Sequence, residues 1–465
     1  MPNLTRRQFL ASTAATGAAP LLAKKKPPLP PPPNVVLIVA EDLAAWMCGC
    51  YGNLDIKTPN IDLLARLGTR FLNAFTIAGA GSPSRATLFT GRTPLQHGIQ
   101  DYLTKTVIED PPQGQAAPPP WFTEEVFLSD ILSAAGYDCG YSGVWDLGDY
   151  TRPGHHLGFT YTVPSGSPYQ NPTIARNGEI APAQGYLPDL ITGAGLEFLD
   201  HQQPGKHFFL TLGYPNPHEP YDGHPQKYYD MYAAAQFETI GWRPRAENAF
   251  RGREYLDDTV ASLRRAAAAI AGLDAQLPKL QRKLREMKVW SDTLVILTSV
   301  NGNTFGRHGL WGAGHGSNPI NMYDDVMRVP LIAAWPGEIP VEGTRPDMFS
   351  VYDLLPTLTE ACRGELPANR NLCGHSFFRP VAKIPESKKV ARRPRHVFGQ
   401  HRDTIMVRDD RFKLVFRDNG EGPNEFYSFA RDPRELRNEY ENLNFITVRD
   451  RMAKLINSWV ETYSR

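Results

Sequence analysis

The stretch Asn34–Ala40, NVVLIVA, is a continuous apolar run that ends at two acids, Glu41 and Asp42. A run without polar alternation is typical of a strand that is buried on both faces of a parallel sheet. Three later stretches repeat the pattern: His207–Leu212, Thr293–Thr298 and Pro330–Ala334. The sequence therefore predicts a mostly parallel sheet whose first strand is this run.

Helical patterns lie between the predicted strands, at Asn60–Leu67 and Arg85–Phe89. A longer pattern has apolar residues spaced by three and four from Ile270 to Met287, and Pro278 is expected to interrupt it. Alternating strands and helices favour an α/β domain with a central, mostly parallel sheet flanked by helices. In such a domain the ligand site is expected at the carboxyl ends of the strands.

From about Arg392 the pattern changes to four short β-type segments: His396–Gly399, Thr404–Val407, Phe412–Phe416 and Glu425–Ser428. They predict a small antiparallel sheet, followed by an amphipathic helix through Val448, Met452, Leu455 and Trp459. We therefore divide the chain into a leader and linker at residues 1–33, an α/β domain at 34–390 and a C-terminal α+β subdomain at 391–465.

The first residues resemble an export signal. Thr5–Leu10 contains the twin arginines Arg6 and Arg7, and the weakly apolar run Ala11–Ala23 that follows is too short to span a bilayer. The prolines of Pro27–Pro33 then form a stiff spacer. We expect export by the twin-arginine route, with Ala23 as the cleavage position, to the periplasm or outside the cell. No later apolar run approaches the length of a membrane span.

The overall charge argues against a nucleic-acid partner. The formal net charge is +1, and removal of Arg6 and Arg7 with the leader lowers it to −1, with no basic stripe along the chain. The five cysteines are too few for a disulfide scaffold and too scattered for a zinc site. Cys362 and Cys373 fit a disulfide or two buried thiols equally well, and nothing in the sequence specifies an oligomeric state.

Two features predict ligand chemistry. Glu41 and Asp42 follow the first strand as adjacent hard oxygen ligands, which favour Ca²⁺ or Mg²⁺. The segment Gly81–Arg92, GSPSRATLFTGR, places a serine before a proline at the start of a helix. Free backbone N–H groups and the helix dipole then face the preceding residue, which favours an anion there.

The segment Gly81–Arg92 resembles the sulfatase signature Cys/Ser-x-Pro-Ser-Arg-x-x-Leu-x-Thr-Gly-Arg. Further segments support the resemblance along essentially the whole chain after residue 33: Pro33–Asn34, Cys50–Gly52, Thr58–Asp62, Pro217–Pro220, His308–Gly312, Arg411–Leu414 and Asp432–Leu436. On these motifs the chain is identified as a member of the sulfatase family, within the alkaline phosphatase superfamily, with a degenerate active site.

In that family the first signature residue is oxidised to formylglycine, whose hydrated form attacks sulfur. Position 81 is glycine here, so the resemblance implies that neither formylglycine nor any direct nucleophile forms at this position. We expect Ser82 and Ser84 to cap the helix rather than to act as nucleophiles.

The positions that hold sulfate in the family also differ in this chain. The resemblance implies that Arg85 and His218 keep their family identities, whereas Val144 and Ala313 replace lysines. Asp146 replaces a histidine, so an anion stands where the family has a cation.

The resemblance also indicates a reduced metal site. Asp42 and Asn301 match family metal ligands, and Glu41 replaces an aspartate with a longer carboxylate. Val300 stands where the family has a third aspartate. We therefore expect Ca²⁺ to bind weakly, if it binds, because a hard cation requires six or more oxygens.

Loss of a nucleophile alone costs a hydrolase roughly 10⁶ in turnover, or about 8 kcal/mol of barrier. We therefore favour a non-catalytic sulfatase-like protein that binds a sulfated or other glycan, or a partner. The loops Gly154–Asn171 and Gly241–Arg253 contain aromatic residues and arginines suited to a carbohydrate. The alternative is a hydrolase of sulfate or phosphate esters that uses metal-activated water, with His308 and His315 as its candidate residues.

Overall fold

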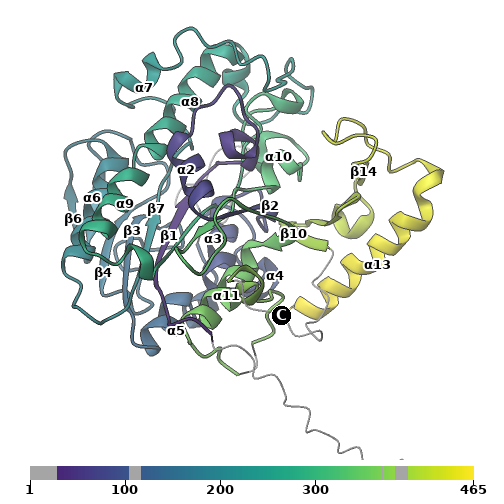
Figure 1. Cartoon of the computed structure of the whole chain (residues 1–465). Helices are drawn as coiled ribbons and strands as arrows, with labels where there is room; N and C mark the ends of the chain where they lie inside the picture. The colour runs from purple at the N-terminus through teal and green to yellow at the C-terminus, as the bar shows by residue number, and fades with distance from the viewer. Residues whose placement is uncertain (1–28, 104–116, 369, 383–395, 465) are drawn as a thin grey trace, which may run out of the picture.

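The computed structural model describes residues 29–103, 117–368, 370–382 and 396–464. The predicted export signal and the predicted boundary at 390/391 lie outside these ranges. Figure 1 shows a large layered unit and, beside it, a small sheet with a long helix, drawn in yellow near the C-terminus.

A ten-stranded sheet forms the centre of the large unit, in the order β10-β2-β9-β8-β1-β7-β3-β4-β5-β6. Its strands are β1 (Asn34–Ala40), β2 (Thr69–Phe75), β3 (Asp138–Val144), β4 (Phe159–Val163), β5 (Thr173–Arg176), β6 (Glu179–Pro182), β7 (Phe208–Gly213), β8 (Thr293–Ser299), β9 (Ile332–Ala334) and β10 (Gly343–Ser350). The strand β1 lies in the interior, parallel to both β7 and β8. The mostly parallel sheet is thus confirmed, although the predicted strand Pro330–Ala334 forms β9 and runs antiparallel to both neighbours.

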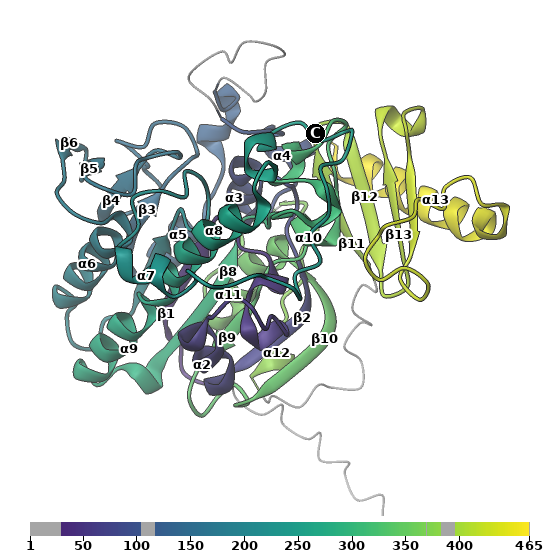
Figure 2. The same cartoon turned by 90° about the horizontal axis from the view of Figure 1, so that it is seen from above.

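The apolar run of β1 is buried on both faces, as its composition predicts. Val35, Leu37 and Val39 belong to one hydrophobic cluster, which contains residues of α3, α5 and α11. Val36 and Ile38 belong to a second cluster, which contains residues of α2, α6, α8 and α9. Helices therefore cover the sheet on both sides, as Figure 2 also shows.

The predicted helical stretches Asn60–Leu67 and Arg85–Phe89 fall in α2 and α3, and further helices lie where none was predicted. The helices of this unit are α2 (Pro59–Leu67), α3 (Gly81–Thr90), α4 (Pro94–His97), α5 (Leu128–Ala134), α6 (Leu187–Asp200), α7 (Gln226–Asp230), α8 (Thr259–Asp274), α9 (Leu277–Glu286), α10 (Asp324–Met327), α11 (Leu354–Ala361) and α12 (Phe378–Val381). The long pattern around Ile270–Met287 is divided between α8 and α9, and Pro278 lies in the first turn of α9. Proline is tolerated there because the first N–H groups of a helix have no partner within it.

The small unit is a four-stranded antiparallel sheet in the order β11-β12-β13-β14. Its strands are β11 (His396–His401), β12 (Thr404–Asp409), β13 (Phe412–Phe416) and β14 (Glu425–Ser428), and α13 (Ile446–Tyr463) packs on it. Trp459 of α13 stacks on Phe398 of β11, with 5.1 Å between ring centroids. The predicted sheet and amphipathic helix are therefore confirmed, and Figure 2 shows them beside β10.

All five cysteines are free thiols in the structure, including Cys362 and Cys373. Within the described ranges, no helix combines the length and the apolar character needed to cross a membrane.

A buried ion cluster joins the small sheet to the large unit. Lys413 of β13 has no exposed side-chain surface, and its Nζ lies 2.6 Å from both Asp324 Oδ1 and Glu435 Oε1. The same Nζ donates to the carbonyl oxygen of Met322 at 2.8 Å, and Arg408 lies 3.0 Å from Asp324 Oδ2. Removal of the lysine would leave the negative charge of two buried carboxylates only partly neutralised, which is destabilising.

We therefore expect Lys413→Ala to lower the free energy of unfolding by about 3–5 kcal/mol, the usual cost of breaking a buried ion pair. Urea unfolding at neutral pH measures the change. Arg437→Ala is the matched control, because the Arg437 side chain is 77% exposed beside Glu439 and such surface pairs contribute about 0–1 kcal/mol. Equal effects of the two substitutions would contradict the structural role of Lys413.

Candidate functional site

The candidate site lies where β1 and β8 end and α3 begins. Ala40 and Ser299 are register partners at the ends of these parallel strands, so Glu41–Asp42 and Val300–Asn301 emerge side by side. The helix α3 begins at Gly81, and a Cβ placed on Gly81 would lie 3.4 Å from Glu41 Oε1 and 3.9 Å from a Val300 methyl. The site therefore occupies the predicted place at the carboxyl ends of the strands.

The position of the missing side chain at residue 81 faces carboxylates. The nearest atom to a Cβ on Gly81 is Asp146 Oδ2, at 3.2 Å, and Glu41 Oε1 follows. Asp146 accepts a hydrogen bond from Ser82 Oγ at 2.8 Å. Burial and the charge of Glu41 raise the pKa of Asp146. The nearest side-chain atoms to the missing Cβ thus belong to acidic groups.

The positive charge of Arg85, on the same helix, is balanced by a carboxylate of the protein itself. Its Nη2 lies 2.5 Å from Glu41 Oε1, and both side chains are almost completely buried. Nη1 lies 3.4 Å from the Tyr141 hydroxyl. Burial acts to lower the pKa of Arg85, but Tyr141, Glu41 and Asp146 together raise it above its usual value. The guanidinium therefore stays charged, and its charge is taken up by Glu41.

Amides hold the carboxylate of Asp42. Asn301 donates to Asp42 Oδ1 at 2.5 Å, and Asn303 donates to Asp42 Oδ2 at 3.1 Å. Burial raises the pKa of Asp42, although His218 and the two amides act in the opposite direction. Asn303 was not among the predicted site residues, because it matches no position of the motif.

The donor set fits a hard divalent cation only in part. Glu41 and Asp42 bring carboxylate oxygens together, but Glu41 Oε1 is already paired with Arg85, and Asn301 faces Asp42 with its amide nitrogen rather than its oxygen. The side chain of Val300 is a buried hydrocarbon at the position that matches a family carboxylate. The buried Glu41 Oε2, which has no hydrogen-bond partner, is the one acceptor of these carboxylates left over. Fewer oxygens are therefore available than the six or more that Ca²⁺ takes.

Of the other predicted site residues, three line a cavity and one is buried away from it. His218, Asp146 and Ala313 line one large cavity. Val144 is completely buried in the second hydrophobic cluster and is not among the residues that line this cavity. A lysine at position 144 would therefore need a different local packing to reach a ligand.

The expectation that Ser82 and Ser84 cap α3 is wrong. The N-cap of the helix is Ala80, and no side chain caps it. Ser82 Oγ donates to Asp146 and accepts the N–H of Leu103 at 2.9 Å, and Ser84 Oγ donates to the carbonyl of Ala78 at 3.0 Å. Both hydroxyls are used to tie the helix to neighbouring segments.

The cavity has a volume of about 840 Å³. Its wall includes the aromatic residues Tyr102, Tyr150, Tyr221 and Trp311. Charged and titratable residues of the wall are Asp42, Asp146, Asp149, Glu219, Arg251, His218 and His315. The predicted sugar-facing loops contribute residues 164–166 and 251–252, whereas residues 159–163 of the first loop form β4 instead. Acids outnumber the permanent cation Arg251 among these described residues.

His218 carries a positive charge at neutral pH. Burial acts to lower its pKa, but the carboxylates of Asp42, Glu41 and Glu219 outweigh burial and raise the pKa to about 9. Its Nδ1 lies 2.7 Å from the carbonyl oxygen of Glu219, so Nδ1 carries a proton. The imidazolium thereby offsets part of the negative charge at the floor of the cavity.

The two histidines that the alternative, a metal-water hydrolase, would use occupy different places: only His315 lines the cavity. His308 stacks on Tyr323 at 3.8 Å and lies 3.3 Å from Asp325 Oδ2, so it is held by side chains that do not line the cavity. His315 lines the cavity, and its Nε2 lies 2.9 Å from Asp101 Oδ1. Burial is the main cause that lowers the pKa of His315 to about 4, so this imidazole is neutral.

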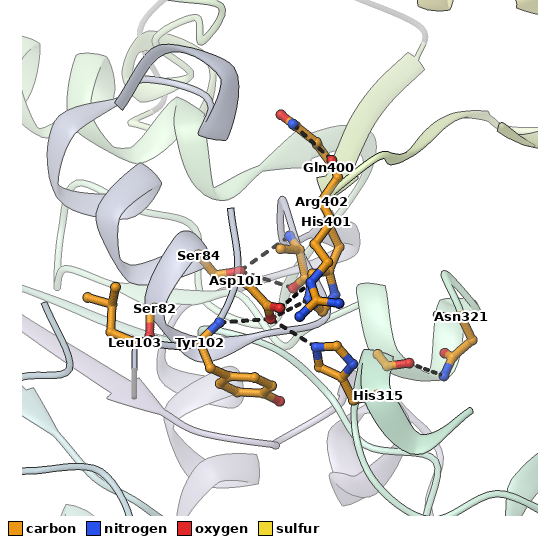
Figure 3. A network of polar contacts seen from close by, with 12 residues as sticks. Ser82, Ser84, Asp101, Tyr102, Leu103, His315, Asn321, Gln400, His401 and Arg402 are labelled. Atoms are coloured by element: carbon orange, nitrogen blue, oxygen red, sulfur yellow. Dashed lines mark hydrogen bonds and ion pairs between the residues drawn. The ribbon is translucent and has the colours of Figure 1, made fainter. Parts of the chain in front are cut away.

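Asp101 is the centre of a polar network that sequence reasoning missed (Figure 3). Besides His315, it contacts His401 at 3.0 Å and Arg402, both from the small C-terminal sheet. Some three hundred positions separate Asp101 from His401, and neither belongs to a recognisable motif. No local sequence signal points to this network.

The raised pKa of His218 predicts a pH-dependent contribution to stability. A histidine whose pKa rises from 6.5 to about 9 on folding stabilises the protein fully below pH 6.5, and this stabilisation is lost as the pH rises through about 9. We expect wild type to be more stable than His218→Gln at pH 6, with the difference largely gone at pH 10. Urea unfolding in the presence of a chelator measures both proteins, and a difference that is independent of pH would contradict the charge assignment.

Residues 3–23 match the twin-arginine translocation signal. The chain is therefore exported by the twin-arginine route, to the periplasm or outside the cell, as the sequence predicted.

Residues 33–364 match the family described as Sulfatase, and residues 318–461 match the family described as N-sulphoglucosamine sulphohydrolase, C-terminal. Arylsulfatase A from Bos taurus is 28% identical over 429 residues, which cover 82% of this chain and 74% of that protein. A likeness of fold extends to BT4656, solved in complex with its substrate D-glucosamine-2-N,6-O-disulfate. It has a TM-score of 0.74 at 19% identity, and covers 93% of this chain and 98% of that one. Ps i-CgsB, in complex with k-i-k-neocarrahexaose, has a TM-score of 0.72 at 23% identity, with 93% of each chain covered. With its central domain and its C-terminal region both matched, this chain belongs to the sulfatase family.

Proposed function

We propose that this protein is a pseudoenzyme of the sulfatase family, one that binds a glycan without hydrolysing sulfate esters through formylglycine. The observation that carries the proposal is Gly81 at the first position of α3, facing Asp146 and Glu41. Glycine has no side chain that can be oxidised to an aldehyde, so the family nucleophile has no precursor in this chain.

The supply of cations also argues against a tightly held sulfate. Val144 and Ala313 carry no charge, and the carboxyl group of Asp146 cannot supply a positive one. Arg85 is paired with Glu41, so sulfate would have to compete with a buried carboxylate. Each charge-assisted contact contributes about 1.5–3 kcal/mol, and several are missing together.

The cavity supports a carbohydrate ligand. Its volume of about 840 Å³ accommodates sugar rings, and Tyr102 and Arg251 supply a flat surface and donors of the kind that sugars use. Two proteins of similar fold were solved in complex with sugars, one with D-glucosamine-2-N,6-O-disulfate and one with k-i-k-neocarrahexaose. Because acids outnumber cations in the wall, we propose that the sugar in the cavity carries no sulfate at its deepest position.

Ca²⁺ is proposed as a weakly held ion at Glu41, Asp42 and Asn301. The two carboxylates provide oxygens, but Arg85 competes for Glu41, and Asn301 would have to turn its amide oxygen toward the ion, so the set is partial.

A second candidate function is the hydrolysis of sulfate or phosphate esters by metal-activated water. One observation favours it: His315 lies at the wall of the cavity and is oriented by a buried carboxylate, Asp101. An imidazole oriented in this way is a common arrangement in hydrolytic sites. This candidate requires turnover, which the experiments below measure.

The binding proposal predicts that the purified mature protein retains oligosaccharides on an array of matched sulfated and desulfated glycans, with desulfated forms bound at least as tightly. Calorimetry on the best oligosaccharide should show Arg251→Ala about tenfold weaker, the equivalent of about 1.4 kcal/mol. Arg253→Ala is the matched control, because Arg253 is exposed on the same loop and is not among the residues that line the cavity. An array without bound oligosaccharides, or equal affinities of the two variants, would speak against a glycan in this cavity.

The pseudoenzyme proposal predicts no aryl sulfate turnover by wild type or by Gly81→Cys. Conversion of the new cysteine to formylglycine would still leave Asp146 3.2 Å from its Cβ and no lysine at positions 144 and 313. Correct positioning of the reactants can lower the reaction barrier by roughly 7–11 kcal/mol, and much of this is lost when no cation holds the sulfate. We expect rescue to need at least Gly81→Cys, Val144→Lys, Asp146→His, Val300→Asp and Ala313→Lys together.

The assay compares wild type, the single variant and the fivefold variant, with mass spectrometry to establish formylglycine in both variants. Wild-type turnover of about 1 s⁻¹ or more, in the range of ordinary enzymes, would favour the metal-water hydrolase. Substantial activity in the single variant would show that other groups of this pocket hold the sulfate.

A further inference from the structure

Three metal-ligating side chains meet at one carboxylate oxygen beside the cavity. Asp101 Oδ1 lies 2.9 Å from His315 Nε2 and 3.0 Å from His401 Nε2, and the three donor atoms all lie within 4.8 Å of one another. All three residues are at least nine-tenths buried. Figure 3 shows them converging from three separate segments of the chain.

Backbone hydrogen bonds hold these segments in place. Gly314, next to His315, donates its N–H to Gly79 at 2.8 Å, and Gln400, next to His401, donates to Ile77 at 2.6 Å. The absence of a side chain at Gly314 is required as well, because a Cβ there would lie 2.7 Å from His401 Nδ1. The three donors are therefore brought together by the fold and not by chance rotamers of mobile side chains.

We propose that Asp101, His315 and His401 form a binding site for a first-row transition metal ion such as Zn²⁺. Two imidazole nitrogens and one carboxylate oxygen are a donor set that such ions take, often with a fourth position left for water or a ligand. Zinc bonds of about 2.0–2.2 Å place tetrahedral ligand atoms about 3.3–3.5 Å apart. The two contacts of Asp101 Oδ1, at 2.9 Å to His315 and 3.0 Å to His401, need to lengthen by only a few tenths of an ångström to admit the ion, and the two imidazole nitrogens lie within 4.8 Å of each other.

The surroundings of Asp101 support the assignment. Oδ1 also accepts the N–H of Tyr102 at 2.8 Å, so three donors surround an oxygen that has two lone pairs. A metal ion bound to both imidazoles replaces two of these crowded contacts. Arg402 holds Oδ2 of the same carboxylate, which orients Oδ1 toward the histidines as an outer-shell partner does in metal sites. The Arg402 side chain is 36% exposed, so water offsets part of its repulsion of a cation.

The site is separate from the oxygen ligands Glu41, Asp42 and Asn301 and differs from them in chemistry. Nitrogen donors favour Zn²⁺ and its neighbours, whereas an all-oxygen set favours Ca²⁺. His315 lines the cavity, so an ion bound to it would lie beside the cavity wall and could be reached from there. An oxygen atom of a bound molecule, or water, would complete the coordination there.

The test uses the mature chain without a histidine tag, freed of metal by a chelator that is then removed by dialysis. We expect calorimetry with Zn²⁺ to show one equivalent bound, and Co²⁺ to develop the visible absorption of a nitrogen-ligated tetrahedral ion. His315→Ala and His401→Ala should each weaken Zn²⁺ binding at least tenfold. His224→Ala is the control for loss of a buried histidine, because His224 pairs with Tyr186 and is not part of the metal-ligating group.

Circular dichroism checks that each variant is folded. If His401→Ala fails to fold, His315→Ala carries the test, since the His315 side chain contacts His401 from the large unit and also borders the cavity, whereas His401 belongs to β11 of the small sheet. Absence of a stoichiometric Zn²⁺ ion in wild type would overturn the proposal. So would undiminished binding by His315→Ala, or binding that is lost in Asp42→Asn instead, because the ion would then lie elsewhere.

Discussion

The site depends on the balance of charge in a volume from which water is excluded. Glu41, Asp42 and Asp146 are all buried or line the base of one cavity, and each must be neutralised by protein groups or by protonation. Arg85 neutralises Glu41, and His218 with two amides offsets Asp42. Asp146 receives only a hydrogen bond from the Ser82 hydroxyl, and its pKa is raised. The charges of these carboxylates are thus balanced mainly within the chain, and little positive charge remains for the anion of a sulfate ester.

Much of the fold follows from simple patterns in the sequence. The apolar run of β1 predicts burial on both faces, and its two neighbours have the same character, so the three pair in parallel. The break between α8 and α9 follows from one proline. The direction of β9 was not predictable, because a short apolar segment has the same composition in a parallel and in an antiparallel pair.

From the sequence, only those site residues could be predicted that lie at strand ends or within a recognisable motif. Strand ends bring Glu41 and Asp42 next to Asn301, and the signature-like segment begins a helix at Gly81. The partners of Ser82 were not predictable, because its hydroxyl bonds to Asp146, more than sixty positions away, in place of the local backbone. Asn303 and Asp101 were missed for the same reason: their roles depend on contacts between segments that are distant in the sequence.

The small C-terminal sheet contributes His401 to the group around Asp101, and its strand β13 carries the buried Lys413. Domains emerging during synthesis tend to fold in order from the N-terminus. The nascent large unit therefore has Asp101 and His315 in place without His401, and Asp324 without Lys413, until the last segment of the chain is translated. The groups around Asp101 and Asp324 are thus completed late in biosynthesis, and a chain that terminates early leaves these buried acids without their partners.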